Sequence, residues 1–202
     1  MYVTFPSNSL TLEGDLTLHA GAARAAVICH PHPQYGGDMH NSVVRAVETA
    51  LQQAGFTTLR FNFRGVGRST GAYDGGAREQ DDARAAVTYL QDRSSTTPVT
   101  LAGYSFGAMV ALQAGDNLAA VERLIAVAPP LAFFDLAFLA GCTKPKVFIV
   151  GDHDQYCSVS ELTHQLAVVA EPKTRSILAG ADHFFFGFES AIGDAVGGFV
   201  ER

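Results

Sequence analysis

From Ala25 onward, apolar, β-rich runs alternate regularly with helical patterns, and this alternation leaves few possible folds. The apolar runs cover residues 25–29, 57–62, 99–103, 123–127, 146–151 and 174–178. Candidate helices occupy residues 42–53, 78–92, 106–114, 159–170 and 189–200. Strands that alternate with helices in this way predict an α/β fold with a mostly parallel sheet and helices on both of its faces.

Several of these runs are apolar at consecutive positions, as at residues 27–28 and 147–150. Continuous apolarity is typical of strands that are covered on both faces. The N-terminal part differs, because the strand patterns at residues 2–5 and 10–18 have no helical pattern between them. We expect these two segments to form an antiparallel hairpin at one edge of a sheet of about eight strands.

The chain has 202 residues, which fits one domain spanning residues 1–202. A (β/α)₈ barrel usually needs about 250 residues, so the length disfavours that fold. There is no internal repeat, and the short polar run at residues 92–98 is interpreted as a loop, not as a linker between domains.

The charge distribution disfavours several classes of partner. The net charge is −6, and Lys and Arg form no cluster, so we expect no nucleic acid and no anionic membrane surface as partner. Residues 1–12 lack the pattern of a secretory signal, and the most apolar segment, residues 124–139, is too short to span a bilayer. Three scattered cysteines, Cys29, Cys142 and Cys157, do not form a disulfide framework or a zinc ribbon. We therefore expect a cytoplasmic protein, and the sequence does not indicate its oligomeric state.

A candidate nucleophile, Ser105, lies in a Gly-Tyr-Ser-Phe-Gly motif at residues 103–107. This motif matches the G-x-S-x-G nucleophile elbow, which needs a buried strand before the serine and a helix after it. Both are predicted here, and the flanking glycines permit the strained turn. The same pattern surrounds Ser69, but the glycine-rich residues that follow it cannot begin a helix. Ser69 is therefore interpreted as a loop residue.

A serine nucleophile needs a base, and the base needs an orienting acid. Among seven histidines, His183 lies just after the last predicted strand. Asp152 and Asp154 follow the preceding strand, and Asp135 is a further alternative for the acid. The chain order serine, acid, histidine and the location at carboxyl ends of parallel strands both indicate a catalytic triad.

These segments together carry a resemblance to a known superfamily. The motifs at residues 30–41, 61–69, 103–107, 151–154 and 182–185 resemble those of the α/β-hydrolase superfamily, in particular its small, cap-less bacterial serine hydrolases and esterases related to dienelactone hydrolases. In that superfamily the acid commonly lies in a Gly-x-x-Asp motif after its strand, which implies Asp154 rather than Asp152. Dienelactone hydrolases proper have a cysteine where this chain has Ser105, so their own reaction is not implied.

An oxyanion hole needs two preorganised N–H donors. The backbone N–H of Phe106 is one candidate, because it lies at the positive end of the helix after the serine. The second is expected in the loop after residues 25–29, where two prolines have no N–H. The resemblance implies the N–H of His32 there, with Gln34 and Tyr35 next in line.

The segment at residues 128–145 leaves no room for a cap domain, so we expect an open site for small or short-chain acyl substrates. Aromatic residues that could line a substrate pocket, or equally pack in the core, are Tyr35, Tyr104, Phe133, Phe134 and Phe184.

The His-x-His pair formed by His30 and His32 has a rival interpretation as part of a metal site. The metal-dependent hydrolases that use such a pair are barrels, for which this chain is short. A dinucleotide site at residues 62–67 lacks the third glycine and a following helix.

We therefore predict a serine hydrolase that cleaves a small-molecule carboxylic ester through Ser105, His183 and Asp154, with no metal and no cofactor. A thioesterase or an acyl-peptidase with the same triad is the alternative, and a metal-dependent hydrolase is a more remote one.

Overall fold

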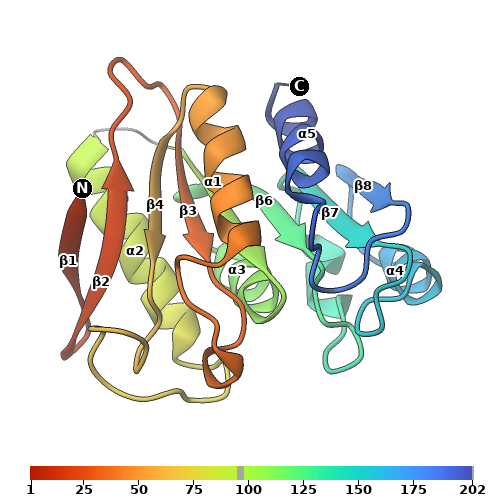
Figure 1. The fold of residues 1–202 in the computed structure, drawn as a ribbon, viewed down its shortest axis with the longest axis horizontal. Coiled ribbons are helices and arrows are strands. Elements are labelled where there is room, and N and C mark those ends of the chain that lie inside the picture. The colour runs from red at the N-terminus through yellow and green to blue at the C-terminus, as the bar shows by residue number, and fades with distance from the viewer. Residues whose placement is uncertain (95–97, 202) are drawn as a thin grey trace.

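The computed structural model describes residues 1–94 and 98–201 and contains one eight-stranded sheet, in the order β1-β2-β4-β3-β5-β6-β7-β8 (Figure 1). The strands are β1 (Tyr2–Ser7), β2 (Leu10–Thr17), β3 (Ala25–Cys29), β4 (Thr57–Phe61), β5 (Val99–Tyr104), β6 (Val121–Val127), β7 (Lys146–Gly151) and β8 (Lys173–Leu178). The helices are α1 (Ser42–Gln53), α2 (Glu79–Ser94), α3 (Phe106–Asp116), α4 (Val159–Leu166) and α5 (Glu189–Val200).

The strands from β4 to β8 in the sheet order are parallel to one another, and only β2 runs in the opposite direction. β1 pairs antiparallel with β2, and β2 pairs antiparallel with β4, so the predicted hairpin lies at one edge. Alternate residues of β1 are buried, as expected for a strand with one face in solvent. β3, β4, β5 and β7 are buried at every position, as the continuous apolar stretches of β3 and β7 predict.

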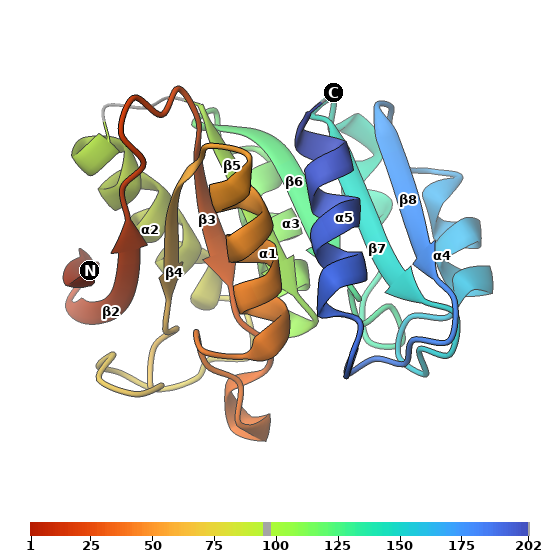
Figure 2. The same ribbon diagram turned by 45° about the horizontal axis from the view of Figure 1, so that its top comes forward.

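Helices cover both faces of the sheet, which confirms the predicted fold class. α1 and α5 lie side by side on one face, where Val43, Val47, Leu51 and Ile192 are buried in a shared core (Figure 2). α2, α3 and α4 lie on the other face and bury their apolar side chains in a second, larger core. The carboxyl ends of the parallel strands therefore meet at one end of the molecule, the lower end in Figure 1.

Several predicted boundaries differ from the structure by one or more residues, and two of these differences change the interpretation of a segment. α2 continues to Ser94, so the polar run predicted as a loop at residues 92–98 begins in a helix, and residues 95–97 lie outside the described residues. α4 ends at Leu166 instead of residue 170, because the next N–H groups bond to carbonyls only three residues back. This tighter turn brings Val169 into the core.

Residues 128–145, which join β6 to β7, hold only a short 3₁₀ helix, η2 (Ala137–Gly141). As predicted, no cap domain is inserted there. None of the helices in residues 1–94 and 98–201 is long and apolar enough to cross a membrane.

Candidate active site

Ser105 lies in a sharp turn between β5 and α3, at the carboxyl end of the sheet. Its φ of 53° and ψ of −120° lie outside the region that residues with a Cβ prefer, at a cost of about 1–3 kcal/mol. The Ser105 N–H donates to the carbonyl of Val127 in β6 at 2.9 Å, which holds the turn against the neighbouring strand. The strained backbone is thus fixed by the sheet, and the side chain is partly exposed.

The two glycines of the motif are required by close backbone approach. A Cβ on Gly103 would lie 2.1 Å from the carbonyl oxygen of Gly107, and a Cβ on Gly107 would lie 2.4 Å from the carbonyl oxygens of Cys29 and His30. The start of α3 therefore rests directly on the end of β3. This contact brings the loop after β3 next to Ser105.

His183 bridges the serine and an acid. Its Nε2 lies 2.9 Å from Ser105 Oγ, and its Nδ1 lies 2.9 and 3.0 Å from the two carboxylate oxygens of Asp154. Both side chains are almost fully buried, at 5% and 4% exposure for His183 and Asp154. A carboxylate beside Nδ1 holds the proton on that nitrogen, so Nε2 is free to accept the proton of the serine hydroxyl.

The loop after β7 orients Asp154 independently of the histidine. Asp154 Oδ1 also accepts hydrogen bonds from the backbone N–H groups of Tyr156 at 2.8 Å and Cys157 at 2.9 Å. The carboxylate is therefore held by its own loop as well as by the histidine. The structure thus brings together the three residues that the sequence singles out.

The alternative acids point elsewhere. Asp152 accepts a hydrogen bond from the Gly180 N–H at 2.7 Å, and Asp135 accepts one from the Ala137 N–H at 2.9 Å. Ser69, the serine of the second motif, is buried in a loop, where it donates to the Asn62 carbonyl and accepts from an N–H of β2. Each of these side chains has a local structural contact.

The loop after β3 supplies the candidate oxyanion donor. The Gln34 N–H donates to His32 Nδ1 at 3.2 Å, and the Tyr35 N–H donates to the His32 carbonyl at 3.1 Å, so both alternative donors are used within the loop. Within the described part of the chain, the N–H of His32 itself has no hydrogen-bond acceptor. The Phe106 N–H is in the first position of α3, where no carbonyl of the helix can accept it.

The two histidines of the His-x-His pair are both engaged. Burial lowers the pKa of His30 to about 4, and its Nε2 accepts the Phe63 N–H at 3.0 Å while its Nδ1 donates to the Pro31 carbonyl. Burial also lowers the pKa of His32, whose Nε2 lies 3.0 Å from the Tyr73 hydroxyl. Among residues 1–94 and 98–201, no three His, Cys, Asp or Glu side chains are grouped as a metal site.

The predicted pocket residues divide into two groups. Tyr35, Phe133 and Phe184 are exposed at this end of the molecule, at 88%, 74% and 47%. Two assignments need correction: Tyr104 is buried beneath His183 and donates to its carbonyl, and Phe134 packs against the larger core. Tyr104 is buried because it lies at the end of the covered strand β5, whereas Phe134 is partly buried where the loop after β6 meets the core.

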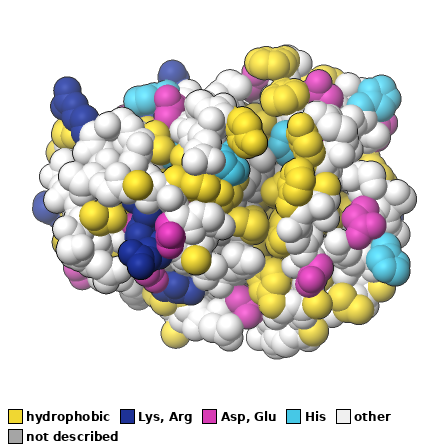
Figure 3. Space-filling model, turned by 90° about the horizontal axis from the view of Figure 1, so that it is seen from below, with side chains coloured by type: hydrophobic (Ala, Val, Ile, Leu, Met, Phe, Trp, Pro, Cys, Tyr) yellow, Lys and Arg dark blue, Asp and Glu magenta, His cyan; other side chains and the backbone are white. Residues whose placement is uncertain are grey.

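Two aromatic residues beside the site were not predicted from the sequence. The Tyr156 ring lies 4.8 Å from the His183 ring, and Tyr73 lies against His32. Tyr156 follows Asp154 by two positions, which is a signal that could have found it. Figure 3 shows this end of the molecule, with hydrophobic side chains gathered around histidines across its middle.

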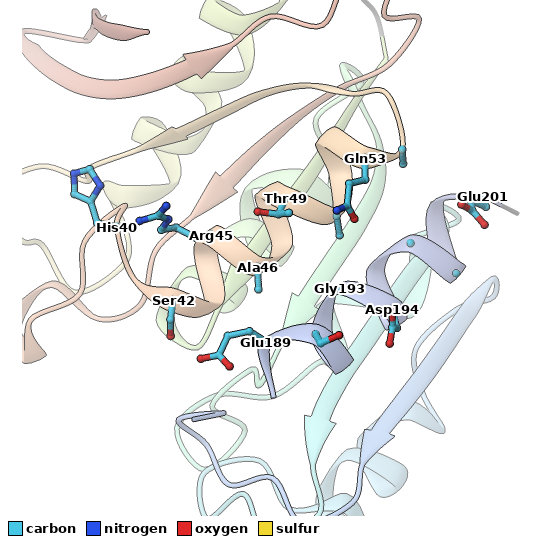
Figure 4. A pocket seen from close by; sticks show the side chains of 15 residues that line it. His40, Ser42, Arg45, Ala46, Thr49, Gln53, Glu189, Gly193, Asp194 and Glu201 are labelled. Atoms are coloured by element: carbon cyan, nitrogen blue, oxygen red, sulfur yellow. The ribbon is translucent and has the colours of Figure 1, made fainter. Parts of the chain in front are cut away.

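A cavity of about 960 Å³ lies elsewhere, in the groove between α1 and α5 (Figure 4). Residues such as Arg45, Thr49, Glu189 and Asp194 line it. Its lining includes none of the three residues of the candidate triad, so the candidate site around Ser105 rests on geometry and not on cavity size.

Comparisons with known proteins concern the family and the fold of the chain. The model of the family described as "Serine aminopeptidase, S33" matches residues 22–135. An uncharacterized protein of Rickettsia prowazekii is 36% identical over 172 residues, which cover 81% of this chain and 72% of that protein.

Solved structures are similar over almost the whole chain. An alpha-beta serine hydrolase homologue from Coxiella burnetii is 32% identical, with a TM-score of 0.91 over 98% of this chain and 95% of that one. A serine hydrolase without lid from Xanthomonas campestris is 33% identical, with a TM-score of 0.86 over 100% of this chain and 94% of that one.

Proposed function

The chain belongs to the serine aminopeptidase S33 family of the α/β-hydrolase superfamily, and we propose that it is a serine hydrolase that cleaves carboxylic esters of small molecules through an acyl-enzyme. The observation that carries this proposal is the 2.9 Å contact between Ser105 Oγ and His183 Nε2, with Asp154 on the other ring nitrogen. The link to dienelactone hydrolases stays a prediction from the sequence.

In the first half of the reaction, Ser105 Oγ attacks the ester carbonyl carbon while His183 Nε2 takes the hydroxyl proton. Asp154 stabilises the imidazolium that forms. The N–H groups of Phe106 and His32 donate to the oxyanion, and each such donor typically contributes a few kcal/mol to the stability of the transition state. The ester C–O bond then breaks, and His183 passes its proton to the leaving alcohol oxygen.

In the second half, a water molecule attacks the acyl-enzyme. His183 takes a proton from the water and returns it to Ser105 Oγ as the acid is released. All of these steps use side chains and backbone groups of this chain. The reaction as proposed needs no metal and no cofactor.

The same machinery permits two other acyl transfers, and the family's description as an aminopeptidase favours one of them. A thioesterase or an acyl-peptidase would use the same nucleophile and base. Hydrolysis of three butanoyl substrates, an ester, a thioester and an amide, distinguishes an esterase from a thioesterase and an acyl-peptidase. We expect the ester to have the highest kcat/KM, and an equal or faster amide would favour the peptidase.

A fluorophosphonate probe tests the nucleophile. We expect one covalent adduct on Ser105, absent in Ser105→Ala and present in Ser69→Ala, which changes the serine of the second Gly-x-Ser-x-Gly motif. Absence of labelling, together with activity that a chelator removes, would contradict the proposal and favour a metal-dependent hydrolase.

A further inference from the structure

Exposed aromatic side chains are concentrated at the proposed active site. Among the described residues, the exposed aromatic side chains are Tyr2, Tyr35, Phe133, Tyr156, Phe184 and Phe186. Tyr2 lies on the edge strand β1, whereas the other five lie on the loops that follow β3, β6, β7 and β8. Figure 3 shows the resulting apolar surface. Concentrated apolar exposure of this kind marks a binding surface.

Two of these rings flank the imidazole of His183. The Tyr156 ring lies 4.8 Å from it at an interplanar angle of 79°, and the Phe184 ring lies 5.8 Å from it at 86°. Each ring has an outer neighbour: Phe133 lies 5.9 Å from Tyr156, and Phe186 stacks on Phe184 at 6.1 Å. The four rings and the imidazole of the base thus form one series of ring contacts.

The segment that carries Phe133 is tied to the loop of the proposed acid. The Ala132 N–H donates to the Tyr156 carbonyl at 3.0 Å. Phe133 therefore keeps its place beside Tyr156 although its side chain is 74% exposed. Ring contacts, not a deep cavity, are what this surface offers to a ligand.

The chemistry of the proposed reaction indicates which part of the substrate meets these rings. His183 Nε2 must pass its proton to the leaving alcohol oxygen, so that oxygen lies within hydrogen-bond distance of His183. The alcohol portion then lies against the side chains that contact the imidazole. We propose that Phe133, Tyr156, Phe184 and Phe186 form a subsite for an aryl group on the alcohol portion of the ester. This inference rests on the proposed ester hydrolysis.

An aryl group suits this surface better than an alkyl chain. Aromatic rings attract each other in edge-to-face and offset-stacked arrangements beyond the contribution of buried area. A flat ring can make such contacts with shallow, exposed walls, whereas an alkyl chain gains mainly from enclosure. The proposed leaving group is therefore an arylalkyl alcohol.

Two acetate esters test the subsite, 2-phenylethyl acetate and 2-cyclohexylethyl acetate. Both give the same acetyl-enzyme and differ only in the alcohol portion, so a difference in kcat/KM reports how that portion affects binding and acylation. We expect the phenyl ester to be favoured about tenfold, the upper range for one aromatic pair. Equal values, or a preference for the cyclohexyl ester, would overturn the inference.

Variants that keep apolar bulk show which rings are responsible. We expect Phe133→Leu and Phe184→Leu each to lower the phenyl-to-cyclohexyl ratio by a factor of about two to ten. Tyr2→Leu removes an exposed aromatic ring far from the site in the sheet order, and it should leave the ratio unchanged. A ratio that is the same in all three variants would contradict the inference.

A second pair of esters, methyl 3-phenylpropanoate and methyl 3-cyclohexylpropanoate, carries the ring on the acyl portion instead. We expect a ratio near one for this pair, and an aryl preference found only here would overturn the assignment to the alcohol portion. If the proposed ester hydrolysis itself were wrong, all four esters would stay intact and Ser105 would stay unlabelled. Failure of the subsite alone would leave the esters cleaved without an aryl preference.

Discussion

The hydroxyl of Tyr104 donates a 2.8 Å hydrogen bond to the backbone carbonyl of His183. Tyr104 immediately precedes Ser105, so this bond ties the end of the nucleophile strand to the loop that carries the base. Burial, together with the carboxylates of Asp154 and Asp182, raises the pKa of Tyr104, so its hydroxyl keeps the proton that it donates. His183 is thus held at its backbone carbonyl by Tyr104 as well as at its imidazole by Asp154.

Tyr104→Phe removes this hydroxyl and keeps the ring. We expect kcat to fall about tenfold with little change in KM, because the imidazole loses part of its preorganisation while the substrate surface is intact. The free energy of unfolding should fall by about 1–3 kcal/mol, since the buried carbonyl loses its donor. Steady-state kinetics and urea unfolding measure the two effects.

Tyr89→Phe is the matched control, because Tyr89 lies on α2 and stacks on Phe5, remote from the loop of His183. Its kcat should equal that of the unchanged protein. A normal kcat in Tyr104→Phe would show that the Asp154 contact alone positions His183.

The strand–helix alternation was sufficient to predict the layers of the fold. A strand with a continuous apolar sequence usually lies in a sheet that is covered on both faces. The elbow was predictable for a related reason: only Gly fits at residues 103 and 107, where a Cβ would clash with backbone atoms. Such steric requirements restrict the residue type at a position, so they can be recognised in the local sequence.

The exposure of the aromatic side chains around the site could not be recognised in the local sequence. Nothing local distinguishes Phe133, which is exposed, from Phe134, which packs against the core. Their difference depends on how the loop after β6 meets the loop of Tyr156, a contact between segments far apart in the chain. Tyr104 was misassigned for the same reason, since its partner is 79 residues away.

Asp154→Asn tests the choice of acid. An asparagine keeps the shape but no longer fixes the proton on His183 Nδ1, so we expect kcat to fall by a factor of about 10⁴, as in other triads. Asp152→Asn is the matched control, because Asp152 contacts the Gly180 N–H instead of the imidazole. If Asp152→Asn caused the larger loss of kcat, Asp154 would be the wrong carboxylate.

Replacement of glycine by alanine should have opposite effects in two helices. In α3, Gly107→Ala places a Cβ 2.4 Å from two backbone oxygens, and we expect a loss of stability of about 1–3 kcal/mol or more and loss of activity. In α5, a Cβ on Gly197 meets no atom within 4 Å, and we expect Gly197→Ala to stabilise the protein by about 0.5–1 kcal/mol. Thermal unfolding of both variants checks the prediction, and an active, stable Gly107→Ala would contradict the close contact.

His30 should make stability depend on pH. Its pKa is lowered by burial from 6.5 to about 4 in the folded protein, so below pH 6.5 the unfolded chain binds a proton that the folded protein does not. The stability associated with neutral His30 is complete above pH 6.5 and is lost as the pH falls toward 4, by about 3 kcal/mol. Urea unfolding at the two pH values measures this loss.

His30→Gln should remove that part of the pH dependence, since glutamine does not titrate and can still accept the Phe63 N–H that His30 Nε2 accepts. The variant should be less stable than the unchanged protein at pH 7, because the edge-to-face contact of His30 with the Phe63 ring, 4.7 Å between centroids, is lost. Its stability should nevertheless fall less between pH 6.5 and 4. His164→Gln, at an exposed position of α4, should keep the full pH dependence. If both variants lost stability with falling pH as steeply as the unchanged protein, the acid sensitivity would come from other groups, and the buried neutral state assigned to His30 would be wrong.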